Sequence, residues 1–361
     1  RAPVSLEEPL ITEVLHGRTV LVSGAGGSIG SELCRQVLRF APRKLVLLDR
    51  TENSLFHIHR ELVAQGSEVE LVPALADICD RARVESLLRE HCPEVVLHAA
   101  AHKHVPLMEL NPCEAIKNNV QGTRILAEVA ASCAVSTFVM ISTDKAVNPT
   151  SVMGATKRIA ECFVQALSSR SGTRFAAVRF GNVLGSAGSV VPIFREQIER
   201  GGPITVTDPE MRRYFMTIPE ASQLVLQAAS MGEGGEIFIL DMGEPVRVLD
   251  LAKDLIRLSG YKQDDIDIVF TGTRPGEKLF EELSLDDELA TRTRHPKVFI
   301  GKLRPWPLEE IVAGIDHLVR VALTGDEAVA RDLLKRLVPE YQTPARSTPP
   351  VSLEVPVDSQ V

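Results

Sequence analysis

An apolar run that breaks on a cluster of glycines and then continues at helical spacing is the feature that most constrains this fold. In RTVLVSGAGGSIGSELCRQVLRF (residues 18–40), the apolar residues are first consecutive and then recur as Ile29, Leu33 and Val37. This order predicts a buried strand, a tight turn and a helix. Further short apolar runs that alternate with helical segments lie at 44–50, 69–78, 94–102 and 137–143. Such alternation is typical of an α/β fold with a doubly wound parallel sheet buried on both faces.

The glycine cluster has the spacing of a turn that binds a dinucleotide. Gly24, Gly27 and Gly30 permit a tight turn and close approach of pyrophosphate, while the start of the helix offers unpaired N–H groups. Asp49 ends the next apolar run 19 residues after Gly30, where a carboxylate accepts hydrogen bonds from ribose hydroxyls. A glycine turn that only packs helix on strand would leave Asp49 unexplained. We therefore predict a Rossmann-type dinucleotide-binding domain.

The cofactor is predicted to be NAD, because Asp49 would repel the 2′-phosphate of NADP. Arg50 beside it could instead receive that phosphate, so this alternative stays open. Asp77 ends a further apolar run and could accept a hydrogen bond from the adenine amino group, or serve as a helix N-cap or turn residue. The other residues that we assign to the cofactor site are Ser28, Ile29, Ile78, Ala99, Ala100, Ala101, Asn119 and Lys157.

Four regions follow from the pattern along the chain. The alternation of strands and helices becomes looser after residue 183, and the last residues are rich in Pro, Ser and Thr. We expect a leader or linker at 1–16, the NAD-binding domain at 17–182, a mainly substrate-binding smaller α/β lobe at 183–338 and a flexible tail at 339–361. Residues 217–243 are expected to return to the large sheet.

Composition and charge exclude several classes of partner. The net charge of −8 argues against a nucleic-acid partner, which requires clustered Lys and Arg. No apolar run approaches the roughly 20 residues of a membrane span. The six cysteines form no Cys-x-x-Cys pair, so we expect reduced thiols in a cytoplasmic setting and no metal site. The chain begins with Arg1, so we expect a fragment or processed product whose missing segments could include a membrane anchor.

Eight motifs resemble the nucleotide-sugar 4,6-dehydratases of bacterial polysaccharide and glycan biosynthesis. They are SGAGGSIGSELCRQ, LLDRTE, HAAAHKHVPLME, NNVQGT, STDKAVNPTSVMGATKR, RFGNVLGSAGSVVPIF, MRRYFMTIPEA and RPGEKLFEEL, spread over about residues 17–300. That family comprises extended short-chain dehydrogenase/reductases acting on UDP-N-acetylglucosamine. The resemblance is closest to its large membrane-anchored members, in which methionine can replace the tyrosine four residues before the site lysine, as Met153 does before Lys157 here. It implies a homo-oligomer, a dimer or larger, in the cytoplasm or at the cytoplasmic face of the inner membrane.

The expected chemistry depends on a carboxyl and an amine at a strand end. Such a dehydration is redox-neutral: hydride leaves C-4, the C-5 proton and C-6 hydroxyl are lost, and the hydride returns to C-6. Asp144 and Lys145 follow the apolar run 137–143 and offer one acid and one base, unless they are a solvated loop pair. The resemblance implies that Asp144 protonates the C-6 oxygen and Lys145 deprotonates C-5. Lys145 could do so if burial or neighbouring cations such as Lys157 lower its pKa.

The missing tyrosine leaves the C-4 proton without an obvious carrier. Ser142 or Thr143 is expected to relay it through an ordered water, while Lys157 holds the nicotinamide ribose. Met153 fills the space beside the nicotinamide, or is simply core.

The substrate site is expected to collect basic and polar side chains. His102, Lys103 and His104 follow another strand end and could donate to cofactor phosphate or sugar hydroxyls, but adjacent side chains diverge too much for a metal. Arg212, next to Arg213, is explained equally well as an ordinary surface residue. The resemblance implies that UDP is bound by Asn182, Arg213, Arg274 and Glu277.

Two other functions compete with the dehydratase. A UDP-sugar 4-epimerase of the same fold stores hydride in the same way, but Met153 disfavours it because epimerisation needs a tyrosine at C-4. The same residue motivates a non-catalytic NAD-binding module. Asp144, Lys145 and Lys157 argue against that module.

Overall fold

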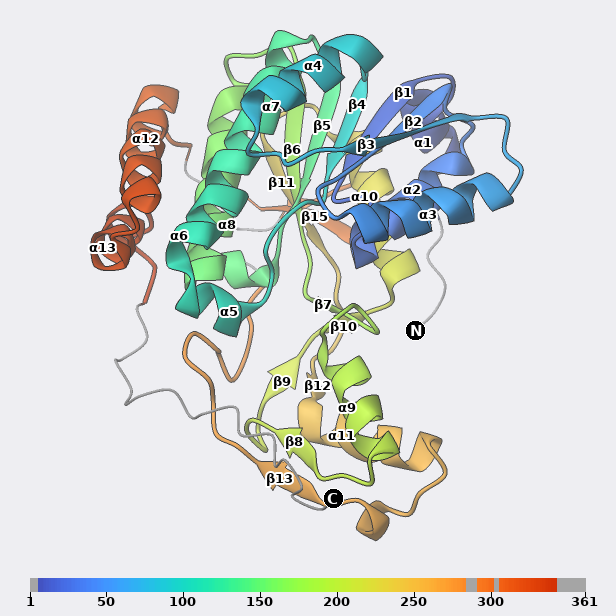
Figure 1. The fold of residues 1–361 in the computed structure, drawn as a ribbon, viewed down its shortest axis with the longest axis vertical. Coiled ribbons are helices and arrows are strands. Elements are labelled where there is room, and N and C mark those ends of the chain that lie inside the picture. The colour runs from blue at the N-terminus through green and yellow to red at the C-terminus, as the bar shows by residue number, and fades with distance from the viewer. Residues whose placement is uncertain (1–5, 284–290, 302–304, 343–361) are drawn as a thin grey trace.

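The computed structural model describes residues 6–283, 291–301 and 305–342, which form a large lobe built on one sheet and a smaller lobe beneath it (Figure 1). The nine strands of the sheet run in the order β14-β15-β11-β6-β5-β4-β1-β2-β3. The seven mutually parallel strands are β1 (Thr19–Ser23), β2 (Lys44–Asp49), β3 (Glu70–Leu75), β4 (Val95–His98), β5 (Thr137–Ile141), β6 (Arg174–Arg179) and β11 (Glu236–Leu240). The remaining two are β14 (Thr291–Arg292) and β15 (Val298–Gly301), with β15 antiparallel to both of its neighbours. The expected doubly wound α/β fold is confirmed.

Helices cover both faces of the sheet because the central strands are apolar on both sides. In β1, Leu21 packs into one core cluster while Val20 and Val22 pack into the other. One face carries α1 (Glu8–Leu15), α2 (Ser28–Leu38), α3 (Glu52–Ala64) and α10 (Ile218–Met231). The opposite face carries α4 (Arg81–His91), α5 (Val105–Leu110), α6 (Pro112–Ala115), the π-helix η1 (Ile116–Gly122), α7 (Thr123–Ser132), α8 (Val152–Ser168), α12 (Leu308–Thr324) and α13 (Glu327–Leu337).

The large lobe contains segments that the sequence pattern assigned elsewhere. Within the expected leader, α1 buries Ile11 and Leu15 against the core and contacts α10. Within the expected substrate lobe, β15 extends the large sheet, and α12 and α13 pack on α8. At the start of the expected tail, Tyr341 is buried; residues 343–361 lie outside the described residues. The sequence pattern predicts no separate helix or strand at these positions, because the looser alternation after residue 183 and the polar start of the chain do not show which surface each segment docks on.

The smaller lobe has a core of its own. Val191, Phe194, Val248 and Ile256 belong to a third cluster that is separate from the two clusters of the sheet. Its elements are α9 (Val190–Glu199), β8 (Ile204–Val206), β9 (Arg212–Arg213), β12 (Val246–Arg247), α11 (Val248–Leu258), the 3₁₀ turn η3 (Gln263–Asp265) and β13 (Ile268–Phe270). A two-stranded ribbon, β7 (Asn182–Val183) with β10 (Phe215–Met216), lies where the lobes join (Figure 1).

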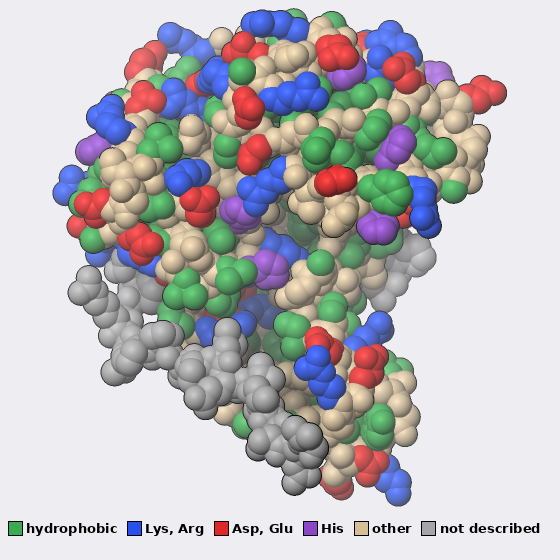
Figure 2. Space-filling view, viewed as in Figure 1, with side chains coloured by type: hydrophobic (Ala, Val, Ile, Leu, Met, Phe, Trp, Pro, Cys, Tyr) green, Lys and Arg blue, Asp and Glu red, His purple; other side chains and the backbone are tan. Residues whose placement is uncertain are grey.

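The carboxyl ends of the parallel strands face the smaller lobe. Figure 2 shows a hollow between the lobes on this side, with basic and histidine side chains around it. In an open parallel sheet, ligands bind at this edge because the loops there converge. In the described ranges, no helix has both the length and the apolar character needed to cross a bilayer.

Candidate active site at the carboxyl edge of the sheet

The glycine turn joins β1 to α2 with little spare room. Gly24 has φ +68°, and a Cβ there would lie 2.7 Å from the Ala100 backbone nitrogen. A Cβ on Gly30 would lie 1.9 Å from the Gly24 carbonyl oxygen, so close packing of helix on turn requires glycine. Gly27 is the N-cap of α2 and has no side chain to accept from the first helical N–H groups. These features fit a turn that presents backbone N–H groups to a pyrophosphate.

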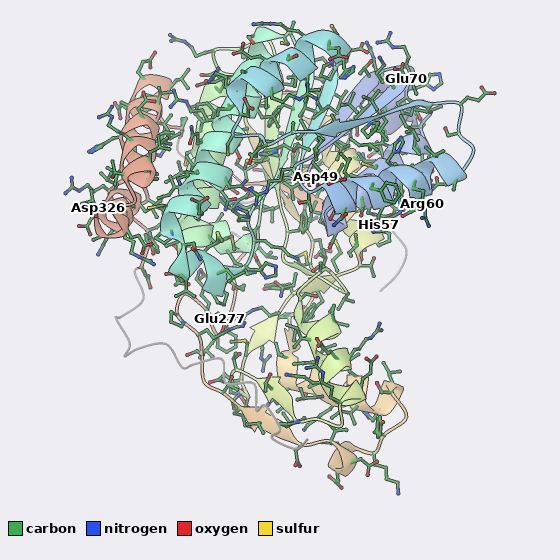
Figure 3. All side chains as sticks on the ribbon, in the orientation of Figure 1. Asp49, His57, Arg60, Glu70, Glu277 and Asp326 are labelled. Carbon is green, nitrogen blue, oxygen red and sulfur yellow. The ribbon has the colours of Figure 1, made fainter. Side chains whose placement is uncertain are left out.

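Asp49 joins the glycine turn to the end of β2. Its Oδ2 accepts from the Gly26 backbone N–H at 2.9 Å, and its Oδ1 accepts from that of Thr51 at 2.8 Å. Figure 3 shows Asp49 within the large lobe, beside α3. Beside it lies a pocket of about 480 Å³ lined by Arg50, Thr51, Leu75, Ala76 and Asp77. A carboxylate fixed next to residues that line such a pocket fits the ribose of a bound nucleotide.

The structure separates the alternatives for Asp77 and Arg50. Asp80, not Asp77, caps α4, so the N-cap explanation of Asp77 is wrong. The Asp77 carboxylate accepts from the Cys79 N–H at 2.8 Å and lies 3.7 Å from the Arg50 guanidinium. The other contact of that guanidinium is His102 Nε2 at 3.1 Å. With Asp77 beside it, Arg50 is partly neutralised as a site for a 2′-phosphate.

Asn119 clamps the chain that follows β4. Its side chain accepts from the His102 N–H at 2.8 Å and donates to the His102 carbonyl at 3.0 Å and to Thr156 Oγ1 at 3.1 Å. The residue lies in η1 and is fully buried. The side chain therefore shapes the edge of the cofactor site through the backbone that follows Ala99–Ala101. In the same π-helix, a Cβ on Gly122 would lie 2.6 Å from Ile78 Cδ1, so Ile78 packs there against a glycine.

The loop after β5 brings the predicted acid and base into direct contact. Asp144, in the 3₁₀ turn η2 (Asp144–Ala146), is fully buried, so a solvated loop pair is excluded. Asp144 Oδ1 accepts from Thr143 Oγ1 at 2.9 Å and from Lys145 Nζ at 2.8 Å. Lys145 Nζ also donates to Asn182 Oδ1 at 3.1 Å. Four residues of the predicted site thus form one hydrogen-bonded group.

The charged form of Lys145 is favoured in this group. Burial alone would lower the pKa of Lys145, but the carboxylates of Asp144 and Glu281 outweigh burial and raise the pKa above its ordinary value. Arg213 is the neighbouring cation, and it opposes them only in part. Burial acts in the direction expected from the sequence, but the pKa of Lys145 is raised overall, so the condition of a lowered pKa is not met in this arrangement.

Ser142 and Met153 point into the core. The Ser142 hydroxyl donates to Glu161 Oε1 at 2.6 Å, and Glu161 is held by Arg179 at 2.7 Å. Met153, in the first turn of α8, is packed in the core cluster. Burial lowers the pKa of Lys157 in the same helix to about 8, although Glu161 opposes the shift. Of the two hydroxyls proposed for the C-4 proton, only that of Thr143 is bonded to Asp144.

The residues proposed for UDP have unequal roles. The Arg213 guanidinium donates to the carbonyls of Lys278 at 2.7 Å and Leu279 at 3.1 Å, so it fastens the RPGEK segment. Arg274 pairs with Glu277, which lies at the boundary between the lobes (Figure 3). Burial, Lys103 and Arg274 together lower the pKa of His104. Lys103 and Arg274 thus lie near enough to act on His104 electrostatically, and together with burial they favour its neutral form.

Glu281 is a site residue that the sequence reading missed. It is buried, and its Oε1 lies 3.9 Å from Lys145 Nζ and 3.9 Å from Arg213 Nη2. The motif RPGEKLFEEL contains two adjacent glutamates, and no spacing rule distinguishes the buried Glu281 from the exposed Glu282. Only the position of the segment above Lys145 identifies it.

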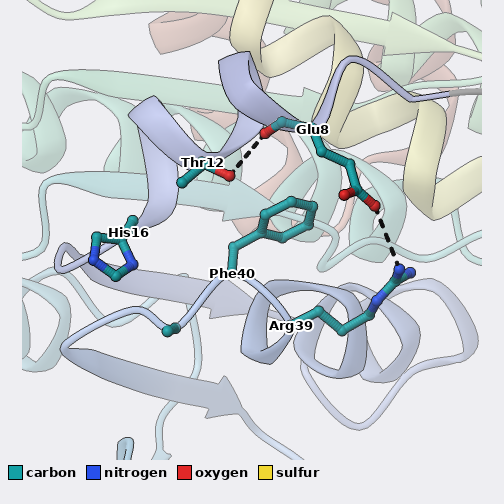
Figure 4. Close-up of a pocket in the computed structure, with 6 residues that line it drawn as sticks. Glu8, Thr12, His16, Arg39 and Phe40 are labelled. Atoms are coloured by element: carbon teal, nitrogen blue, oxygen red, sulfur yellow. Dashed lines mark hydrogen bonds and ion pairs between the residues drawn. The ribbon is translucent and has the colours of Figure 1, made fainter.

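A second pocket lies away from this site. It has a volume of about 270 Å³ and is lined by Glu8, Thr12, His16, Arg39, Phe40 and Ala41 (Figure 4). These residues precede β1 and β2, so the pocket is at the amino ends of the strands, opposite Asp49 and Asp144. Within the part of the chain that the structure describes, no group of three or more His, Cys, Asp or Glu side chains is placed to hold a metal ion.

Comparisons with known proteins agree with this geometry. The chain is 56% identical over 321 residues to the capsular polysaccharide biosynthesis protein CapD of Staphylococcus aureus, covering 88% of this chain and 54% of CapD. It is 32% identical over 280 residues to a UDP-N-acetylglucosamine 4,6-dehydratase (inverting) of Campylobacter jejuni, covering 76% of this chain and 80% of that protein. It is equally 32% identical over 281 residues to a UDP-glucose 4-epimerase of Rickettsia rickettsii, with coverage of 76% and 79%.

One solved structure is similar to this chain in both fold and sequence. The X-ray structure of Pen from Bacillus thuringiensis matches with a TM-score of 0.74 at 35% identity, over 82% of this chain and 90% of that one. The chain spans about half the length of the first curated relatives that it matches. A model of the family described as "Polysaccharide biosynthesis protein" matches residues 20–303, and the chain therefore belongs to this polysaccharide biosynthesis protein family.

Proposed function

We propose that this chain binds NAD and catalyses the 4,6-dehydration of UDP-N-acetylglucosamine to a UDP-4-keto-6-deoxy-N-acetylhexosamine for bacterial glycan biosynthesis. The observation that carries the proposal is the buried Asp144–Lys145 contact of 2.8 Å, next to Thr143 and Asn182 at the carboxyl edge of the sheet. The name of the Campylobacter jejuni relative supports the substrate.

The residues around the cofactor support NAD binding. The glycine turn, the start of α2 and the Asp49 carboxylate fit pyrophosphate and ribose, and the pocket beside Asp77 has room for adenine. Bound NAD would supply the acceptor that takes hydride from C-4 and the donor that returns it to C-6. Lys157, on α8, is the residue that we assign to the nicotinamide ribose.

The Asp144–Lys145 pair can perform the elimination without an outside acid or base. The pair rests as ammonium and carboxylate, and transfer of one proton across the 2.8 Å contact gives the neutral amine and the neutral carboxylic acid that the elimination needs. Lys145 Nζ then takes the proton from C-5 while Asp144 gives its proton to the C-6 oxygen, which leaves as water. The pair ends as ammonium and carboxylate, so protons and charge balance. Lys145 later returns its proton to C-5 as hydride reaches C-6, and the proton released from the C-4 hydroxyl restores the Lys145 ammonium, so that the pair ends in its starting state.

The C-4 proton requires a separate carrier. Thr143 is the hydroxyl that we assign, because Thr143 Oγ1 already donates to the Asp144 carboxylate at 2.9 Å. An ordered water between Thr143 and the sugar completes the relay. Met153 takes no part in proton transfer.

A product assay tests this proposal. The chain is incubated with NAD and UDP-N-acetylglucosamine, and the products are resolved by NMR. A 4-keto-6-deoxy sugar is expected, and Lys145→Ala should abolish both the product and the exchange of the C-5 hydrogen with deuterated solvent. Asp144→Asn should instead leave C-5 exchange measurable while slowing loss of the C-6 hydroxyl. Wild-type exchange in Lys145→Ala would exclude Lys145 as the base.

The same assay examines the competing functions. A UDP-sugar 4-epimerase, suggested by the name of the Rickettsia relative, would return the C-4 epimer with the C-6 hydroxyl retained. A non-catalytic NAD-binding module would return unchanged substrate. The buried acid–base contact argues against both, because neither function needs a base directed at C-5.

A further inference from the structure

Glu281 lies in a segment that is fastened directly over the acid–base pair. The Arg213 guanidinium donates to the carbonyls of Lys278 and Leu279, and the Arg212 N–H donates to the Leu279 carbonyl at 3.0 Å. On the other side, Lys278 Nζ donates to the Val147 carbonyl at 2.9 Å. The segment is thus bound both to β9 and to the loop that carries Lys145.

A second pair of contacts fixes the same segment to the loop before α8. Thr150 Oγ1 donates to the Gly276 carbonyl at 3.0 Å, and Asn148 Nδ2 donates to Glu282 Oε2 at 3.1 Å. The position of the Glu281 carboxylate is therefore fixed by neighbours on both sides.

The Glu281 carboxylate is held near Lys145 without being its hydrogen-bond acceptor. Its Oε1 is 3.9 Å from both Lys145 Nζ and Arg213 Nη2, whereas Asp144 Oδ1 is 2.8 Å from Lys145 Nζ. Its Oε2 is buried and finds no hydrogen-bond partner among the described residues, and the same holds for Asp144 Oδ2. Two carboxylates with one unpaired oxygen each therefore flank a single amine.

Unpaired oxygens of this kind cost free energy, since a buried polar atom without a partner loses its hydration. Burial raises the pKa of Glu281, while Lys145 and Arg213 oppose that shift; in its carboxylate form the side chain acts on Lys145 through its charge over 3.9 Å without a hydrogen bond. The charged groups that face Lys145 are Asp144, Glu281 and Arg213, and those that face Glu281 are Lys145, Asp144, Arg213 and Lys278.

We propose that Glu281 is a positioning residue whose carboxylate sets the pH range in which Lys145 can remove the C-5 proton. The proposal rests on the dehydratase function above, in which Lys145 is the base. A negative charge at this distance stabilises the ammonium form of Lys145. The neutral amine of Lys145 therefore holds a proton more strongly, which makes it a stronger base. Glu281 itself touches neither the C-5 hydrogen nor the departing hydroxyl.

The test is the pH dependence of C-5 exchange. The rate of deuterium incorporation from solvent is measured over a range of pH with the whole chain, NAD and UDP-N-acetylglucosamine. Exchange rises as Lys145 loses its proton, so the midpoint of the rise reports the Lys145 proton affinity. Glu281→Gln removes the charge and keeps the shape, and the midpoint should move to lower pH by about one unit or more. Glu281→Asp should restore most of the wild-type midpoint.

Glu282→Gln is the matched control, because Glu282 is the next residue, is exposed and pairs with Lys278 rather than with Lys145. Its midpoint should equal that of the wild type. A change in maximal rate with an unchanged midpoint in Glu281→Gln would overturn the proposal, since a purely structural role predicts that result.

Failure of one variant to fold leaves the test intact. Glu281→Ala also removes the charge, but without placing a buried amide where the carboxylate was. The midpoint of C-5 exchange should move to lower pH in this variant as well. If neither charge-removing variant folds, Glu281 is required for the fold rather than for the proton affinity of Lys145, and the proposal is overturned. Absence of C-5 exchange in the wild type would instead refute the dehydratase function.

Discussion

The Ser142 hydroxyl donates a 2.6 Å hydrogen bond to the Glu161 carboxylate, 19 residues further along the chain and inside the core. Glu161 is fully buried and is also held by Arg179. The neighbouring hydroxyl of Thr143 points the other way and bonds to Asp144. Of these two consecutive residues after β5, Ser142 therefore contacts the core and Thr143 contacts the site, because side chains of an extended chain alternate in direction.

Substitutions of these two residues should have opposite effects. Ser142→Ala removes one donor from a buried carboxylate that keeps Arg179, so the free energy of unfolding should fall by about 1–2 kcal/mol. Turnover should stay within a few-fold of wild type. Thr143→Val should instead slow turnover by about 10²-fold or more, with little change in stability. Denaturant unfolding and product formation are measured for both variants, and a larger loss of turnover in Ser142→Ala would contradict the assignment.

Asp49 should support both cofactor affinity and the local fold. Asp49→Ala removes the acceptor for the Gly26 and Thr51 N–H groups, as well as the proposed acceptor for the ribose. The affinity for NAD should fall by about tenfold or more, and the free energy of unfolding by about 1–3 kcal/mol. Asp49→Asn, which keeps one acceptor oxygen, is the matched control and should lose less of both. Titration with NAD and with NADP measures the effect; unchanged NAD affinity in Asp49→Ala would remove the ribose assignment.

Met153→Tyr tests whether removal of the C-4 proton is slow because the site has no phenol. Met153 is buried in a close-packed core, so the larger ring should lower the free energy of unfolding by about 1–3 kcal/mol. If Thr143 and water carry the C-4 proton, turnover should rise by no more than a few-fold. Met153→Leu, of similar volume, controls for packing. A hundredfold rise in turnover, within the range of about 10²–10⁴ for acid–base assistance, would show that the native site lacks a C-4 base.

Lys157 should make stability depend on pH. Burial lowers its pKa from 10.5 to about 8 in the folded chain, so between these values the unfolded chain binds the proton that the folded chain has lost. Stability of the cofactor-free protein should therefore rise with pH across this window. At pH 7 the buried charge should cost on the order of 3 kcal/mol relative to Lys157→Met.

Unfolding free energies of wild type and Lys157→Met, measured from pH 7 to pH 10, test this dependence. The advantage of Lys157→Met should shrink as pH rises, while its turnover is abolished throughout. A difference that is constant with pH would mean that Lys157 is not desolvated in solution.

The sequence by itself determined the features that depend on neighbours along the chain. The apolar runs and glycine spacing predicted the strand, turn and helix around Gly24 and Gly30, where a Cβ would meet backbone atoms. Asp49 was found because the end of a strand fixes its distance from that turn. Asp144 and Lys145 were found for the same reason, since carboxyl ends of parallel strands meet at one edge.

Tertiary structure alone decided the features that depend on contacts between distant segments. Glu281 reaches Lys145 from more than 130 residues away, and its charge helps raise the Lys145 pKa that burial would lower. Arg213 donates to the backbone of residues 278–279 rather than remaining free for a diphosphate. Local propensity contains no information on such contacts, because the sign of a pKa shift depends on which charges packing brings within a few ångströms.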